Sequence, residues 1–256
     1  MVTIKSKEEI EILREGGKRL AAILSRVAEA VRPGVPSLEL DALARRMVAE
    51  GGDSPSFLNY QAKRDKKKFP AALCVSVNDE IVHGLPSGEK ILQEGDIVGI
   101  DLGLRHNGLC TDAALTLAVG AIDEQSRKLL EVTKQALTCA IERAHAGATI
   151  GDIGYVVESF VKAQGAFGIV RDLAGHGVGY EVHEEPFVPN YGKQGGGIKL
   201  EAGMVLALEP MLTLGSEKIV LSADGFAYRT KDGSRSAHFE HTVVITEKGA
   251  EVLTKI

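Results

Sequence analysis

Two aspartates, Asp101 and Asp112, flank a segment that is typical of a hairpin turn. Asn107 and Gly108 lie there between two apolar runs, and Asn-Gly in this position is the strongest short hairpin signal. With these two residues as the turn, position 112 lies opposite position 103. The two acids are then diagonal neighbours on one face, roughly 7 to 8 Å apart. That spacing suits two carboxylates that hold a pair of cations roughly 3.5 to 4 Å apart.

The ordinary interpretation of such aspartates is a strand end for Asp101 and a solvated position for Asp112. The neighbours of Asp101 argue against it, because Ile100 and Leu102 embed the acid in an apolar strand. On a half-buried sheet two like charges would force one acid to be protonated unless a cation lies between them. We therefore predict a metal site at this hairpin.

Three other residues have the surroundings expected of ligands. His176 lies in Gly-His-Gly-Val-Gly, where glycines let the backbone come close to a ligand and leave the imidazole unobstructed. A phosphate-binding loop is the alternative, but the Lys-Ser/Thr ending and the dinucleotide glycine spacing are absent. Glu209 ends an apolar run, and Glu240 leads into one. The four carboxylates would balance two divalent cations, and with one imidazole they suit Mn, Fe, Co or Zn better than calcium.

The elements that must position these residues occur twice. Apolar or small residues three and four positions apart predict a long helix from Ile10 to Val31, ended by Arg32-Pro33-Gly34. A shorter helix follows, with Ser37 as its expected N-cap and Gly51-Gly52 as its end. The second half repeats the order. It has a helix with Leu130, Leu137 and Ile141, a break at Gly147, an expected cap at Thr149, and a helix with Ile153, Val156, Val157 and Phe160.

Strand-like segments follow both helix pairs, and two of them match at a constant offset of 108 residues. Leu92 to Asp101 reads LQEGDIVGID, and Leu200 to Glu209 reads LEAGMVLALE, so that each ends in an acid. We interpret them as two related halves, roughly 6–120 and 123–256, packed into a single domain spanning 1–256. The alternative is chance, because a glycine followed by apolar residues is a common way to begin a strand.

The composition is that of an ordinary globular protein. Hydrophobic residues make up 44% and charged residues 25%, and the net charge is -5, so nothing indicates binding to DNA or to a membrane. The first fifteen residues are charged and lack the apolar core of a signal peptide, which favours a cytoplasmic location. Cys74, Cys110 and Cys139 are odd in number and far apart, so we expect reduced thiols that are mostly buried.

Seven segments in this order resemble the methionine aminopeptidase family over nearly the whole chain. They are 78–84 (NDEIVHG), 101–103 (DLG), 110–112 (CTD), 175–179 (GHGVG), 183–186 (HEEP), 209–210 (EP) and 239–242 (FEHT). The resemblance is to the short, bacterial type I kind, without an N-terminal zinc-finger extension. It implies an α+β, pita-bread fold, in which two pseudo-symmetric αβ halves surround a central antiparallel sheet.

The resemblance also implies roles for individual residues. Asp101, Asp112, His176, Glu209 and Glu240 would be the ligands of two divalent metal ions, with Asp112 and Glu240 bridging both. His83 and His183 match the two histidines that face the substrate without binding metal. His183 would donate a hydrogen bond to the developing oxyanion, His83 would contact the scissile amide, and Glu209 would carry a proton to the leaving amine. The methionine pocket would consist of Phe57, Tyr60, Phe69, Cys74, Val182 and Phe226.

The resemblance implies a monomer that removes the initiator methionine from nascent chains and prefers a small second residue. Val182 and Phe226 replace a frequent aromatic residue and a frequent Trp, and Ala62 to Lys68 is an apparent basic insertion. Its ordinary interpretation is a solvated loop, and the sharper one is contact of residues 63–68 with the ribosome. The rivals are a proline-specific peptidase of the same fold, which usually carries an added N-terminal domain, and a metal-free binding module, which would have lost ligands.

Overall fold

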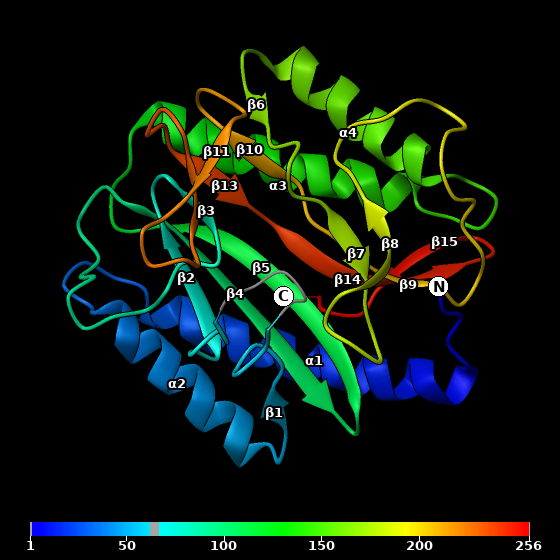
Figure 1. Cartoon of the computed structure of the whole chain (residues 1–256), viewed down its shortest axis with the longest axis horizontal. Coiled ribbons are helices and arrows are strands. Elements are labelled where there is room, and N and C mark those ends of the chain that lie inside the picture. The colour runs from blue at the N-terminus through cyan, green and yellow to red at the C-terminus, as the bar shows by residue number, and fades with distance from the viewer. Residues whose placement is uncertain (1, 62–66, 256) are drawn as a thin grey trace.

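The computed structural model describes residues 2–61 and 67–255 of the chain (Figure 1). The helices are α1 (Lys7–Ala30), α2 (Ser37–Glu50), α3 (Glu124–Arg143) and α4 (Ile150–Gln164). The strands of the first half are β1 (Ser54–Pro55), β2 (Leu73–Val77), β3 (Glu80–Val82), β4 (Ile97–His106) and β5 (Leu109–Ala118). Those of the second half are β6 (Gly168–Ile169), β7 (Gly175–Gly177), β8 (Glu184–Val188), β9 (Val205–Leu208), β10 (Met211–Thr213), β11 (Ile219–Leu221), β12 (Tyr228–Thr230), β13 (Ser236–His238), β14 (Glu240–Thr246) and β15 (Gly249–Val252).

The four predicted helices are present, and their N-termini show how local sequence sets their limits. Thr149 is the N-cap of α4, as predicted, and it forms a capping box with Asp152. The expected cap at Ser37 is wrong, because Pro36 occupies the cap position of α2 and makes no side-chain cap. The Ser37 hydroxyl instead donates to the carbonyl of Ser87 and accepts from its N–H, so it ties α2 to the loop before β4.

A nine-stranded sheet forms the centre of the molecule. Its main path is β1-β4-β5-β14-β9-β7-β8, with β2 beside β4 and β15 beside β14, and every pair is antiparallel. Two small sheets, β13-β10-β6 and β11-β12-β3, complete the strands. In the middle of the large sheet β14 pairs with β5 of the first half and with β9 of its own half. The two halves therefore meet at β5 and β14.

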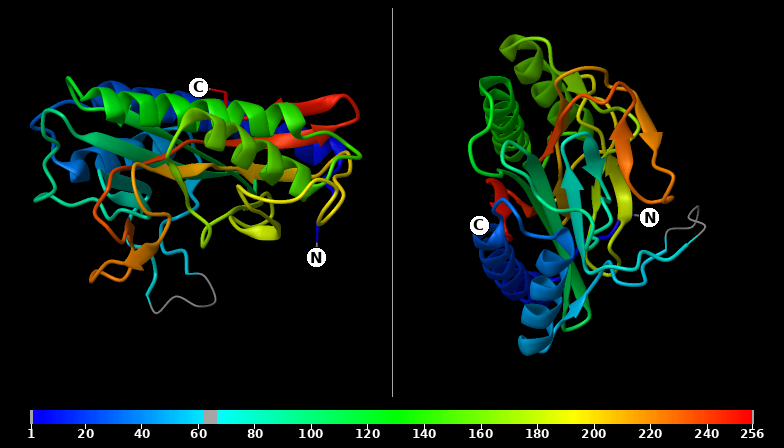
Figure 2. Two further views of the ribbon diagram at one scale, coloured as in Figure 1. Left: turned by 90° about the horizontal axis from the view of Figure 1, so that it is seen from above. Right: turned by 90° about the vertical axis from the view of Figure 1, so that its left-hand side faces the viewer.

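The helices gather on one side of the large sheet, and the strands β11 and β12 stand on the other side (Figure 2). Each half has its own apolar core between helices and sheet. In the first half Leu20 and Leu24 of α1 pack with Ile100 and Leu102 of β4. In the second half α3 and α4 pack on β9 and β14 through residues such as Val157.

The predicted repeat is confirmed by backbone hydrogen bonds that recur in both halves at Leu92 and Leu200, the first residues of the two matched segments. Leu92 donates to the carbonyl of Val35, and Leu200 donates to that of Ala148. Gly34 and Gly147 return the bond, at 2.8 and 2.9 Å. Gly95 and Gly203, which precede the matched strands, both have a φ of 92°, a conformation that favours glycine. Such agreement in bonds and dihedral angles is not expected from chance similarity.

The remaining features predicted from the sequence are the cysteines, the basic insertion and the absence of a membrane span. The thiols are free, with Cys74 and Cys110 buried and Cys139 partly buried, as predicted. Residues 62–66 of the basic insertion lie outside the described residues. In the described ranges no helix has the length and apolar character that crossing a lipid bilayer requires.

Candidate metal centre

The hairpin that carries the two aspartates has the predicted geometry. β4 ends at His106 and β5 begins at Leu109, so the turn consists of Asn107 and Gly108. Their φ angles of 45° and 87° are the positive values that a two-residue hairpin turn requires. Gly103 pairs with Asp112, which makes Asp101 the diagonal neighbour of Asp112, as the sequence predicts.

Strand alternation places both acids on the face away from the helices. Ile100 and Leu102 point into the core beside α1, so Asp101 between them points the other way. Ala113 belongs to the same core, and Asp112 beside it therefore shares the face of Asp101. Asp112 is 4% exposed, so its carboxyl group is removed from water although it is not in an apolar core.

The neighbouring strands bring the other acids to this face. Ala114 of β5 lies opposite Asp101 on one side and opposite Glu240 of β14 on the other. Because directly opposite residues share a face, the small methyl group of Ala114 leaves room between the two carboxyl groups. His176 of β7 pairs in the same way with Ala207 of β9, two residues before Glu209. Alanine thus stands where larger side chains would fill the site.

The structure brings all five predicted ligands together. Ligand atoms of Asp112, His176 and Glu240 lie within 4.8 Å of one another. Oε1 of Glu209 lies 3.4 Å from Nε2 of His176. Asp101 adjoins both Asp112 and Glu209, whose charges act on it. Five side chains, carried on or directly after five different strands (β4, β5, β7, β9 and β14), therefore form one cluster.

The crowding of acids raises their pKa values. Burial raises the pKa of Asp112 to about 7, with a further contribution from the Glu209 carboxylate. Burial likewise raises the pKa of Glu209 to about 7, although nearby His176 opposes the shift. The pKa values of Asp101 and Glu240 lie well above the ordinary range, first through burial and then through the neighbouring carboxylates. At neutral pH the cluster cannot be fully ionised without added positive charge.

Unpaired polar atoms show that a cation fits the cluster. One buried oxygen of Asp101 and one of Asp112 lack hydrogen-bond partners among the described residues. Nδ1 of His176 lies 2.9 Å from the carbonyl of Gly177 and must donate to it, so Nε2 carries a lone pair. That lone pair faces the carboxyl oxygen of Glu209 at 3.4 Å. Two electron-rich atoms at this distance are stabilised by a positive ion between them.

Two further histidines lie beside the cluster. The ring centroids of His176 and His183 are 4.3 Å apart, and Tyr60 Oη lies 2.8 Å from Nδ1 of His183. The protein atoms packed around His183 lower its pKa, and His176 and His83 lower it further, although the side chain is exposed at the surface. His83 follows β3 with a φ of 58°, a strained value for a residue with a side chain. Such strain is frequent at functional sites.

The residues predicted to form the methionine pocket pack together on the same face. Phe57, Phe69, Cys74 and Val182 are buried in one apolar cluster, with Tyr60 and Phe226 against it. The rings of Phe69 and Phe226 meet edge to face, with centroids 5.6 Å apart. Gly103 makes room for this packing, because a β carbon there would approach the Phe57 ring to 2.7 Å. The apolar cluster therefore adjoins the hairpin of Asp101 and Asp112.

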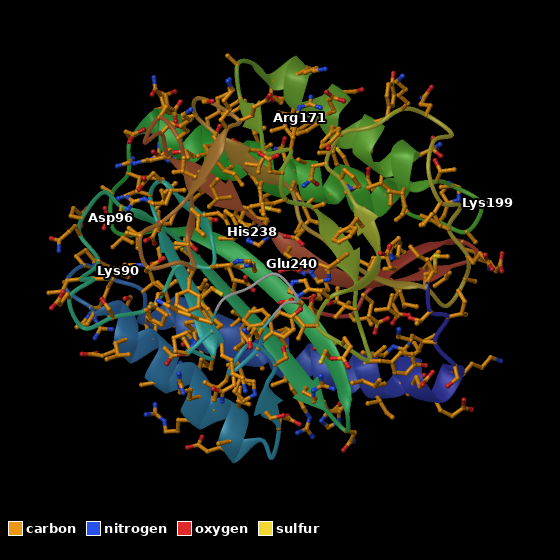
Figure 3. All side chains as sticks on the ribbon, viewed as in Figure 1. Lys90, Asp96, Arg171, Lys199, His238 and Glu240 are labelled. Carbon is orange, nitrogen blue, oxygen red and sulfur yellow. The ribbon has the colours of Figure 1, made fainter. Side chains whose placement is uncertain are left out.

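One histidine beside the acids was not singled out from the sequence. His238 is 4% exposed, and its Nε2 lies 3.3 Å from Oε2 of Glu209. Burial lowers its pKa to about 4, so the ring is neutral at neutral pH. Figure 3 shows His238 and Glu240 near the middle of the molecule. Their spacing of two residues on an extended chain could have indicated a shared face.

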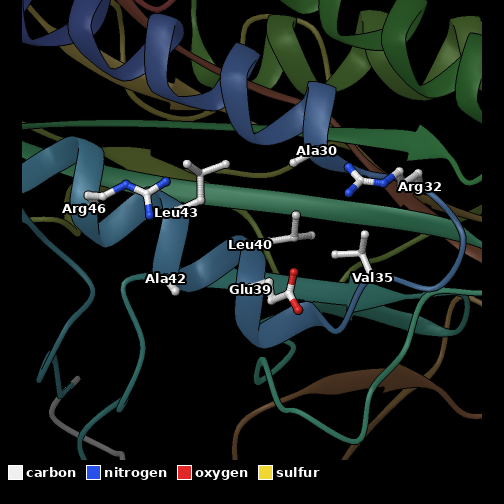
Figure 4. Close-up of a pocket in the computed structure, with 8 residues that line it drawn as sticks. All are labelled: Ala30, Arg32, Val35, Glu39, Leu40, Ala42, Leu43 and Arg46. Atoms are coloured by element: carbon white, nitrogen blue, oxygen red, sulfur yellow. The ribbon is translucent and has the colours of Figure 1, made fainter.

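A second feature, a hollow of about 310 Å³ between α1 and α2, does not share this chemistry (Figure 4). Arg32, Glu39 and Arg46 line it together with apolar residues such as Leu40. Its charged side chains come from α2 and from the loop between α1 and α2, and they include one acid only, so it lacks the converging donors of a metal site. The acid cluster on the sheet is the candidate site.

Comparison with known proteins agrees with this site. The family model for metallopeptidase family M24 matches residues 11–247. A methionine aminopeptidase of Aquifex aeolicus is 45% identical over 257 residues, which cover 100% of this chain and 99% of that protein.

Solved structures show the same fold. The crystal structure of methionine aminopeptidase from Thermotoga maritima matches with a TM-score of 0.95 and 42% identity, covering 100% of both chains. A prolidase from Pyrococcus furiosus matches with a TM-score of 0.77 and 27% identity, covering 99% of this chain and 65% of the prolidase. The expected pita-bread fold is confirmed. The proline-specific peptidases share it at lower identity and in longer chains.

Proposed function

This chain belongs to metallopeptidase family M24 and, within it, to the methionine aminopeptidases. From this premise we propose the following function. The chain is a metal-dependent hydrolase that removes methionine from the N-terminus of proteins and peptides. The observation that carries this conclusion is the cluster of four carboxyl groups and one imidazole lone pair, in a chain that matches these enzymes over its full length. The roles of individual residues, the number of metal ions and the cellular context, described next, are our own proposals.

Asp101, Asp112, His176, Glu209 and Glu240 hold two divalent ions in this proposal. The two oxygens without partners and the raised pKa values support a total charge near +4 between the four carboxylates. As the family resemblance implies, Asp112 and Glu240 would bridge the two ions, and their ligand atoms lie within 4.8 Å of each other and of a ring nitrogen of His176. Such ions lower the pKa of a water molecule towards about 7 and polarise a carbonyl oxygen. Co, Mn, Fe and Zn all suit these donors.

His183 stabilises the negative charge that develops on the carbonyl oxygen. Tyr60 Oη lies 2.8 Å from Nδ1 of His183. In this proposal the hydroxyl donates to Nδ1, so that the ring proton is on Nε2 and is available to the substrate. The lowered pKa of His183 supports a neutral donor. His83, on the other side of the site, contacts the scissile amide. Glu209, the acid closest to both His176 and His238, would carry a proton to the leaving amine.

The apolar cluster beside the hairpin receives the methionine side chain. Phe57, Phe69, Cys74 and Val182 offer a buried apolar surface with Phe226 packed against it, and Tyr60 joins it to His183. An unbranched thioether fits such a surface well. A small second residue would leave His83 and His183 in contact with the first peptide bond.

Several features of context are also proposals. The chain would act in the cytoplasm as a monomer with one catalytic domain, on nascent chains. The basic residues of 63–68 would contact ribosomal RNA through their charge. Comparing ribosome pelleting of the protein with that of a variant in which Lys63, Arg64, Lys66, Lys67 and Lys68 are Ser tests this contact. Equal recovery would exclude it.

The function is tested with purified, chelator-stripped protein reloaded with Co, Mn, Fe or Zn. We expect release of methionine from Met-Ala-Ser, slower release when Leu replaces Ala, and no hydrolysis of a Gly-Pro peptide. Hydrolysis of the proline peptide alone would overturn the assignment in favour of a prolidase. Metal analysis on the same samples counts the ions, and fewer than two per active chain would overturn the dinuclear site.

A further inference from the structure

Glu209 lies between two imidazole rings that approach different oxygens of its carboxyl group. Nε2 of His176 lies 3.4 Å from Oε1, and Nε2 of His238 lies 3.3 Å from Oε2. Both histidines are buried, at 4% exposure each. Each oxygen of the Glu209 carboxyl group therefore has one imidazole nitrogen close to it.

The two rings differ in the hydrogen that each can offer. His176 donates from Nδ1 to the carbonyl of Gly177, which leaves Nε2 as an acceptor. No bond from Nδ1 of His238 to another described residue fixes its tautomer, so the proton of the neutral ring is free to reside on Nε2. Nε2 of His238 is also buried and forms no hydrogen bond in the described part of the chain, although Oε2 of Glu209 lies only 3.3 Å away. Donation to Glu209 satisfies that atom.

The backbone around His238 holds the ring in this place. The hydroxyl of Thr116 accepts from the N–H of His238 at 2.9 Å and donates to its carbonyl at 2.8 Å. These two hydrogen bonds from one side chain take the place of backbone hydrogen bonds between β5 and the end of β13. His238 then stands two residues before Glu240, on the face of the acids.

We propose that His238 is a positioning residue, which donates from Nε2 to Oε2 of Glu209 and so turns Oε1 toward His176 and the cation site. This inference rests on the proposed role of Glu209 as a metal ligand. Outer hydrogen bonds of this kind fix the orientation of a ligating carboxylate and strengthen metal binding. A hydrogen bond that is slightly long without substrate tightens when the site is complete.

The test compares His238→Leu, which removes the donor, with His238→Gln, whose amide N–H can replace it. Binding of Co(II) to the stripped proteins is measured by equilibrium dialysis, with the visible spectrum of each Co(II) form and kcat/KM on Met-Ala-Ser. We expect His238→Leu to lose about 10- to 100-fold in Co(II) affinity and in kcat/KM. His238→Gln should retain most of both.

His241 offers a matched control. It is the next histidine along the chain, on the opposite face of β14, where Nδ1 lies 3.1 Å from the Thr254 hydroxyl and away from the acids. His241→Leu should leave Co(II) affinity unchanged, and melting curves of all variants show that they are folded.

Three outcomes overturn the inference. They are unchanged Co(II) affinity in His238→Leu, a His238→Gln variant as poor as His238→Leu, or a Co(II) spectrum that shows a lost nitrogen ligand. If the parent protein itself neither binds Co(II) nor releases methionine, the proposed function fails instead. A parent with normal binding and an unaffected His238→Leu variant refutes only the role of His238.

Discussion

Asp41 on α2 and Asp112 on β5 are buried almost equally, at 3% and 4% exposure, in opposite electrostatic surroundings. Asp41 accepts from Nε of Arg45 at 2.6 Å and from the backbone N–H groups of Ala72 and Leu73. Asp112 has a carboxyl oxygen without a partner among the described residues, and its charged neighbours include other acids. The first acid is neutralised by the fold, and the second is not.

The same contrast applies to other acids of each kind. Glu184 is paired with Lys5 at 2.8 Å, and Asp53 lies 3.3 Å from Arg19. Glu240, by contrast, is buried among Asp112, Glu209 and Asp101, which raise its pKa after burial itself. Burying an unpaired charge is costly, so a fold that gathers several such acids gains stability only when a cation arrives. Pairing, rather than burial, separates the structural acids from the candidate ligands.

The strongest test of this contrast is removal of a candidate ligand. Glu240→Gln should lower methionine release by about 10⁴-fold or more, the scale of losing a group on which the reaction depends. The metal-free variant should unfold at a higher temperature than the metal-free parent, because one of the repelling buried charges is gone. A variant that keeps its turnover, or a metal-free form that melts earlier, would contradict the contrast.

Removing the cation of a structural pair should have the opposite effect on stability. Lys5→Met leaves Glu184 buried and unpaired, and we expect a loss of about 3 to 5 kcal/mol in the free energy of unfolding, measured in urea. The double variant Lys5→Met, Glu184→Met serves as the control. It should be more stable than Lys5→Met alone, and an equal loss would show that the pairing is not the cause.

Metal removal should change how the free energy of unfolding depends on pH, because the acids of the cluster then titrate without a cation. The pKa of Asp112 rises from an ordinary 3.8 to about 7 on folding, so between these values the folded state binds more protons than the unfolded chain. This contribution is fully present below about pH 4 and is lost as pH rises through 7. Chelated protein should therefore become less stable from pH 5 to 7.5, whereas metal-loaded protein should not.

Urea unfolding at these two pH values, with chelator and with Mn(II), measures this change. Asp112→Asn supplies the control, because its chelated form should lose less stability over the same interval. Identical pH dependence with and without metal would show that the cluster does not bind it.

The smallest expected effect concerns Asp152, a buried acid that the backbone already satisfies. It accepts from the N–H of Thr149, in the capping box of α4, and from that of Gly195, and these two backbone bonds lower its pKa to about 2. Asp152→Asn should cost about 1 kcal/mol, a typical value for a lost cap. In the parent this contribution is present above pH 4 and fades as pH falls through 2. The variant should lack that acid-side loss in urea unfolding, and an unchanged profile would exclude the cap as its source.

Local chemistry made much of this structure predictable. Asn107-Gly108 determines the hairpin, the strand register and the shared face of Asp101 and Asp112, because a two-residue turn allows one pairing only. The repeat could be found because Gly95 and Gly203 begin equivalent strands. The cap at Ser37 could not be predicted correctly, since the hydroxyl is held by Ser87, 50 residues away.

Long-range convergence was predictable only through resemblance. Nothing in the periodicity around His176 or Glu240 shows that β7 and β14 lie two strands apart in one sheet. Those pairings depend on tertiary packing, which local pattern does not contain. His238 was overlooked for the same reason, because the atom it approaches belongs to Glu209 on another strand.

The central position of β14 has a consequence for biosynthesis. A nascent chain that stops before residue 240 lacks the strand that joins β5 to β9, and it lacks one of the carboxyl groups as well. The earlier acids would emerge from translation without their arrangement, and contacts between distant segments form slowly. Acquisition of cations should thus follow completion of the polypeptide, so that each newly made molecule becomes competent only in the last stage of its own maturation.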